Sequence, residues 1–149
     1  MLVGALHFCA WYLLLAETIL TSFQLYSIVL MLFFAVYGMS CVVSMVLPID
    51  TANLVAVVVA LLVPVFGGFV RNLKQWIKYS TYSWWANEAF FSYAITPYED
   101  IFLVDKTAHV WSYTLDETTK DLLMVLMIGV IYRVIAFICM TQLNKEKQS

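Results

Sequence analysis

Residues 23–47, FQLYSIVLMLFFAVYGMSCVVSMVL, run through the chain without one charged side chain. A second apolar stretch, residues 122–143, contains a single charge, Arg133, and from Thr18 to Val70 the only charged residue is Asp50. An uninterrupted apolar run of about 17–25 residues matches a hydrocarbon core about 30 Å thick at 1.5 Å per helical residue. These stretches therefore predict transmembrane helices.

The composition of the whole chain agrees with this prediction. Of its 149 residues, 63% are hydrophobic and 12% are charged, and the mean hydropathy is +0.86. A soluble chain is about 45–50% apolar and about 25% charged, so these few charges cannot cover a soluble surface. The net charge of −2 and the absence of a basic stripe argue against a nucleic-acid partner. We expect an integral membrane protein that crosses the plasma membrane or an internal membrane several times.

We predict an all-α membrane protein with about four transmembrane helices, at about residues 1–16, 23–47, 52–70 and 122–143. The first run is short for a crossing, which suggests that the chain, residues 1–149, is a fragment of a longer protein. The third run is rich in valine, but helix prevails because a bilayer requires backbone groups to pair within the segment. The first run lacks the charged region and cleavage site of a signal peptide.

Residues 71–121 form the predicted loop between the last two spans. Nine aromatic residues from Trp76 to Tyr98 are interleaved with charges, and Trp and Tyr favour the boundary between membrane and water. We therefore expect an interfacial or re-entrant helix here, followed over residues 99–120 by a polar excursion with turns or a short hairpin. Basic residues lie near both ends of the last two predicted spans, and the two groups favour opposite orientations of the chain in the membrane. Charge alone therefore leaves the orientation open.

Three features are candidates for a functional role. Pro64, Gly67 and Gly68 lie near the end of the third span, where they indicate either a kinked helix end or a narrowing in a transport path. Arg133 lies in the middle of the last span, at a cost of at least about 2.5–3.5 kcal/mol. It is either a structural pair or a snorkelling group, or it is part of a conduction or coupling path. Glu88 is an unpaired acid, for which a contact to backbone donors or a basic residue is favoured over catalysis.

Metal binding and nucleotide binding have no support in the sequence. The two histidines and three cysteines have no metal-ligand spacing, and the cysteines fit buried thiols in apolar helices. There is no GxxxxGK[ST] loop, so we expect no catalytic residues, no metal and no cofactor in this chain.

The later part of the chain resembles a known family. A valine-rich span ends FGGFVRNL, an aromatic segment reads YSTYSWWANEAFF, and the last span ends GVIYRVIAFICMTQLNKEK. In this order they are similar to the C-terminal membrane part of subfamily G ATP-binding cassette transporters, the white-brown half-transporters. The likeness includes a W-A-x-E-A-F element at residues 85–90 and an R-x-x-A-F-x-C-M ending at residues 133–140.

The resemblance implies a partial ABC-2 type transporter membrane domain. The four spans correspond to the third through sixth of a type-two exporter fold, residues 71–121 form the large outer loop, and the tail is cytoplasmic. A re-entrant segment containing Trp84, Trp85 and Glu88 is implied within that loop.

The same resemblance assigns site residues. A cavity lined by the third span of this chain carries over to Val57, Leu61 and Pro64. An outward valve carries over to Phe69 and Val70, after a turn formed by Phe66, Gly67 and Gly68. The proline and the absence of a leucine pair depart from the family pattern.

The implied mechanism is alternating access by two half-transporters, identical or different. ATP and Mg²⁺ bind in nucleotide-binding domains that this chain lacks, so we expect no ATPase activity from it. Apolar cavity walls favour lipid-like or amphipathic substrates, and membrane lipid is the expected surrounding. The alternatives are a free-standing four-span scaffold or assembly protein and an intramembrane enzyme that uses Arg133, Glu88 or His7.

Overall fold

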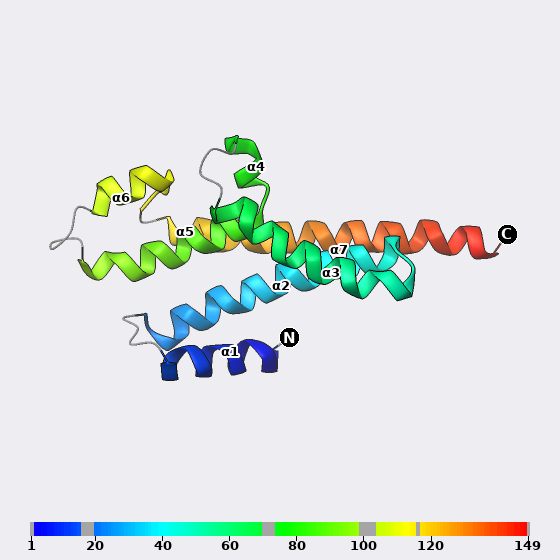
Figure 1. The fold of residues 1–149 in the computed structure, drawn as a ribbon, viewed down its shortest axis with the longest axis horizontal. Coiled ribbons are helices and arrows are strands. Elements are labelled where there is room, and N and C mark those ends of the chain that lie inside the picture. Colours follow the sequence, from blue (N-terminus) through cyan, green and yellow to red (C-terminus); the bar gives the residue numbers. More distant parts are fainter. Residues whose placement is uncertain (1, 16–19, 70–73, 99–103, 116, 149) are drawn as a thin grey trace.

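A computed structural model describes residues 2–15, 20–69, 74–98, 104–115 and 117–148, and these residues contain helices and no strand (Figure 1). The α-helices are α1 (Leu2–Leu15), α2 (Ser22–Val46), α3 (Ile49–Pro64), α4 (Gln75–Tyr79), α5 (Tyr82–Ile95), α6 (Val104–Trp111) and α7 (Thr118–Gln148). A π-helix, η1 (Val65–Phe69), continues α3, and a 3₁₀ turn, η2 (Thr96–Tyr98), follows α5.

The longest helices are α2 and α7, and their ends follow from local sequence. At the start of α2, the backbone N–H of Thr21 donates to the side chain of Gln24 at 3.0 Å, one half of a capping box. The helix ends at Val46, shortly before Pro48, and α3 begins directly after that proline, which cannot continue a helix from its own N–H. The break left between the predicted spans 23–47 and 52–70 is therefore observed, although α3 begins at Ile49.

Among the described helices, α2 and α7 are long and apolar enough to cross a membrane, whereas α1 and α3 are shorter apolar helices. At 1.5 Å per residue the 25 residues of α2 extend about 37 Å. The 14 residues of α1 are too few to cross alone. The all-α membrane fold is thus supported, and the count of four spans stays a prediction.

The central contact of the fold is the packing of α2 along α7 (Figure 1). A Cβ added to Gly129 would lie 2.6 Å from Cδ1 of Phe34, and one added to Gly38 would lie 3.0 Å from the carbonyl oxygen of Gly129. Only glycine allows the two backbones to approach so closely. Two glycines, one on each helix, therefore set the distance between α2 and α7.

Helix α5 lies against the first part of α7 and also contacts α2 (Figure 1). Most of its residues are buried, including Tyr82, Trp84, Trp85 and Ala89. The aromatic segment is a helix, as predicted, but these tryptophans are covered by protein. A helix buried on nearly every side belongs to the core, so α5 is a packed element and not a free loop.

The hairpin predicted within residues 99–120 is wrong for residues 104–111, which form helix α6. Val104 and Ala108 are both buried, and residues four apart lie on one face of a helix. This single apolar face stabilises a short helix. The polar composition of the segment did not indicate this helix. Residues 99–103 and 116 lie outside the described residues.

Candidate transport path and outer gate

The residues predicted to line a path on α3 do not all face the same surroundings. Val57 is 58% exposed and Leu61 is 68% exposed. Leu54, one turn before Val57, is exposed as well. Spacings of three and four residues put these side chains on one face of the helix, which no described part of the chain covers. Pro64, at the end of α3, is partly buried and lies on a cavity.

This cavity has a volume of about 300 Å³ and lies among α1, α2, the end of α3 and α5. Its walls are mainly aliphatic and aromatic, with a few polar groups from α1 and α5; the lining residues are Phe8, Tyr12, Leu25, Ile28, Val29, Leu32, Pro64, Ser83, Ala86, Asn87 and Phe90. A concave apolar site with few polar groups suits an amphipathic ligand. Of the three predicted path residues, only Pro64 lines this cavity.

The predicted gate turn forms the π-helix η1. It begins directly after Pro64, whose missing N–H interrupts the α-helical hydrogen bonds. The hydroxyl of Ser83 on α5 donates to the carbonyl oxygen of Val63 at 3.2 Å, so α5 is bonded to the backbone next to this proline. The kinked helix end is thus fastened to the start of α5.

Gly67 makes the closest contact of this turn. An added Cβ would lie 1.8 Å from Oγ of Ser83 and 2.8 Å from Oγ1 of Thr81. Glycine is required at position 67 because Ser83 and Thr81 lie too close to its backbone to leave room for a side chain. Phe66 is exposed, whereas the surroundings of Gly68, the side chain of Phe69 and all of Val70 lie outside the described residues.

Trp84 and Trp85 anchor α5 to its neighbours. The indole Nε1 of Trp85 donates to the carbonyl oxygen of Tyr79 at 2.9 Å, and the two rings stack at 5.3 Å. Trp84 is 1% exposed and its ring lies 4.9 Å from that of Tyr113, with the ammonium of Lys78 at 5.0 Å from its centroid. Both tryptophans therefore hold α5 against α4 and the loop after α6.

Glu88 is 2% exposed and binds the loop that precedes α7. Its Oε1 accepts a hydrogen bond from the backbone N–H of Thr114 at 2.6 Å and another from the Thr114 hydroxyl at 2.9 Å. Burial, and then the negative charge of Glu88, raise the pKa of Tyr113 to about 12. A backbone donor is one of the two kinds of partner that the sequence favours for this acid, the other being a basic residue.

Arg133 lies between α7 and α2. One guanidinium nitrogen, Nη1, donates to the carbonyl oxygen of Phe34 at 3.0 Å and to that of Gly129 at 3.1 Å. The guanidinium carbon lies 3.5 Å from the centroid of the Phe34 ring, a cation–π distance. Of the two interpretations that the sequence leaves open, this geometry favours a structural contact between helices.

A family model described as ABC-2 type transporter matches residues 2–146 of the chain. The chain belongs to the ABC-2 type transporter family. No curated protein and no solved structure shows a significant match to it. An ABC-2 membrane domain is the permease component of an exporter, and the ATPase site is not part of such a domain.

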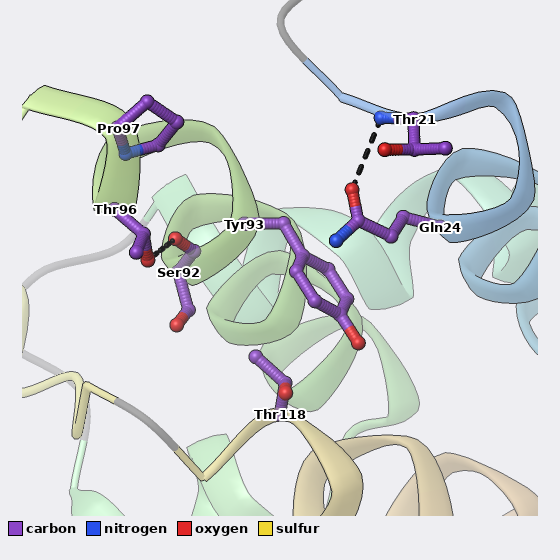
Figure 2. Close-up of a pocket in the computed structure, with 7 residues that line it drawn as sticks. All are labelled: Thr21, Gln24, Ser92, Tyr93, Thr96, Pro97 and Thr118. Atoms are coloured by element: carbon purple, nitrogen blue, oxygen red, sulfur yellow. Dashed lines mark hydrogen bonds between the residues drawn. The ribbon is translucent and has the colours of Figure 1, made fainter.

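This ABC-2 membrane domain has a second, polar cavity that the sequence analysis did not identify. It has a volume of about 420 Å³ and lies where α2 and α7 begin and α5 ends. Figure 2 shows the side chains of Tyr93, Gln24 and Thr118 around it, with Ser92 and Thr96 on the facing turn. Isolated hydroxyl residues in three separate segments give no common sequence pattern, so only the fold reveals this cavity.

Proposed function

We propose that this chain is the C-terminal part of the membrane domain of a subfamily G half-transporter, and that the complete protein exports lipid-like or amphipathic molecules. The observation that carries this proposal is the ABC-2 family match over residues 2–146. The ordered motifs FGGFVRNL, WWANEAFF and RVIAFICM favour subfamily G within that family.

The proposed substrate path combines the apolar cavity with the uncovered face of α3. Val57 and Leu61 would face a second half-transporter across the central path, while Pro64 joins that face to the cavity. Two apolar walls of this kind suit a substrate with a long apolar part. The turn around Gly67 would form the outer end of the path.

ATP and Mg²⁺ would act in nucleotide-binding domains joined to this membrane domain in the complete protein. Closure of those domains would move the helices that carry the path, and α5 would follow because it is fastened to the end of α3. The lipid bilayer would surround the remaining exposed faces.

A cross-linking experiment on the complete transporter tests the arrangement of the two copies. In a variant without Cys9, Cys41 and Cys139, we expect Leu61→Cys to form an intermolecular disulfide under mild oxidation. Phe137→Cys is the matched control, because Phe137 is 62% exposed, close to the 68% of Leu61, but lies on α7. Equal cross-linking at both positions, or none at Leu61→Cys, would contradict the proposed path.

A second experiment tests the substrate class. We expect lipid-like amphiphiles to stimulate ATP hydrolysis by the reconstituted transporter. Asn87→Trp should abolish this stimulation without removing basal hydrolysis, because residue 87 lines the apolar cavity and is exposed. Lys106→Trp, an equally bulky change at an exposed position of α6, should leave the stimulation intact.

A further inference from the structure

The polar cavity where α2 and α7 begin is lined by uncharged residues. The seven described residues around its volume of about 420 Å³ carry hydroxyl or amide side chains, apart from one proline. A charged ligand would need a partner of opposite charge to offset the loss of its hydration. The cavity therefore suits an uncharged ligand that forms hydrogen bonds.

Ser92 supplies a buried hydroxyl that faces this cavity. The residue is 2% exposed, and its carbonyl oxygen accepts a hydrogen bond from the Thr96 hydroxyl at 2.6 Å. The Ser92 hydroxyl itself has no hydrogen-bond partner in the part of the chain that the structure describes. Figure 2 shows this hydroxyl pointing toward the side of the cavity where Thr118 lies. Because buried polar groups are nearly always paired, it indicates a partner from outside the chain.

Three more polar groups lie around the same space. Oε1 of Gln24 accepts a hydrogen bond from the backbone N–H of Thr21 at 3.0 Å, which fixes this side chain and leaves its amide nitrogen as a donor. The hydroxyls of Tyr93 and Thr118 form no hydrogen bond with any described residue. A hydroxyl both donates and accepts, whereas the amide nitrogen only donates. Together these groups match a polyol, in which each hydroxyl is also a donor and an acceptor.

The cavity lies at the level of the membrane where lipid headgroups are found. Of the described helices, α2 and α7 are long and apolar enough to cross a membrane. Thr21, Gln24 and Thr118, which line the cavity, lie at the starts of these two helices, and the ends of membrane-spanning helices lie in the headgroup region. A lipid can therefore place its headgroup in this cavity while its chains stay in the hydrocarbon core.

The apolar cavity lies further along the same pair of helices. Both cavities are lined by residues of α2 and α5, which pack against each other. On α2 the lining changes from Gln24 to Leu25 and continues to Leu32, about 12 Å from Gln24 at 1.5 Å per residue. On α5, Phe90 in the apolar cavity precedes Tyr93 in the polar cavity by about one turn. The seam between α2 and α5 thus changes from polar to apolar toward the membrane interior.

We propose that the polar cavity binds an uncharged, hydroxyl-rich headgroup, such as the single sugar of a glycolipid, and that the attached chain lies along the α2–α5 seam in the apolar cavity. The hydroxyls of Ser92 and Thr118 exchange hydrogen bonds with sugar hydroxyls, and the amide nitrogen of Gln24 donates to a sugar oxygen. This inference concerns binding by this chain and does not depend on the proposed export.

Lipid binding in the absence of ATP tests this site separately from export. The complete protein is placed in phosphatidylcholine nanodiscs, monoglucosyl diacylglycerol is titrated in, and the bound lipid is measured by native mass spectrometry. We expect Ser92→Ala and Tyr93→Phe each to weaken binding of this glycolipid by about 2–10-fold, the effect of one lost hydrogen bond. Ser44→Ala and Tyr26→Phe on α2 are the matched controls and should bind as the parent protein does, because neither residue lines the cavity.

The same titration distinguishes a lipid headgroup from a free sugar. Glucose in solution offers the same hydroxyls without a chain and should bind much more weakly, and Asn87→Trp, which fills the apolar cavity, should weaken binding of the glycolipid. Glucose that binds as tightly as the glycolipid would overturn the role of the chain. Equal binding of anionic phosphatidylserine would overturn the preference for an uncharged headgroup. Equal affinity for the glycolipid in Ser92→Ala, Tyr93→Phe and both controls would overturn the site, because the cavity would then hold only water.

Discussion

Gly67→Ala is expected to destabilise the protein by about 1–3 kcal/mol, the usual cost of overpacking a tight site. The added Cβ would lie 1.8 Å from Oγ of Ser83, and 2.9 Å from its Cβ. These distances are too short for rotation of the hydroxyl alone to relieve the clash. Either η1 or the start of α5 must move, and the hydrogen bond from Ser83 to the carbonyl of Val63 would be lost.

The effect can be measured as a lower melting temperature of the chain in nanodiscs and as reduced transport by the complete protein. Gly4→Ala is a suitable control, because its Cβ would meet Phe33 at an ordinary 3.7 Å. Replacing Ser83 with glycine in the Gly67→Ala background should recover part of the stability. If Gly67→Ala melts at the same temperature as the parent chain, the close packing of η1 on α5 is wrong.

The sequence predicts the main helices well because lipid leaves few alternatives. A long apolar run such as residues 23–47 must pair its backbone groups internally, and the observed helix α2 starts one residue earlier and ends one residue earlier than this run. Proline marks the boundary before α3. The aromatic segment is also predicted correctly as a helix, since its charges are few and its rings need a partly apolar surrounding.

Contacts between distant helices could not be predicted in the same way. Gly67 and Gly129 both lie in apolar stretches of the sequence, but their partners differ. Gly67 meets a hydroxyl from α5, and Gly129 meets a phenyl ring from α2. Glu88 and its hydrogen-bond partner Thr114 are 26 positions apart in the sequence, and no local pattern connects them. Packing determines which side chains meet, so their chemistry is visible only after the helices are placed.

Arg133→Ala is expected to have the second large effect, a loss of about 2 kcal/mol or more. A hydrogen bond from a charged donor contributes about 1.5–3 kcal/mol, and a desolvated cation–π contact contributes about 2 kcal/mol. Removal of an unfavourable charge from an apolar helix offsets part of this loss. The net effect should still be destabilising because the guanidinium contacts both α2 and α7.

A double-mutant cycle separates this structural role from a role in conduction. Arg133→Ala and Phe34→Ala should be less than additive in stability, with a coupling of about 1–2 kcal/mol. Arg133→Lys should recover little, since an ammonium cannot stack on the Phe34 ring as a planar guanidinium does. As a control, Phe33→Ala should be additive with Arg133→Ala, because Phe33 packs toward α1. Unchanged stability in Arg133→Ala together with a loss of transport would instead assign Arg133 to the transport path, because a residue that only joins two helices cannot be removed without loosening them.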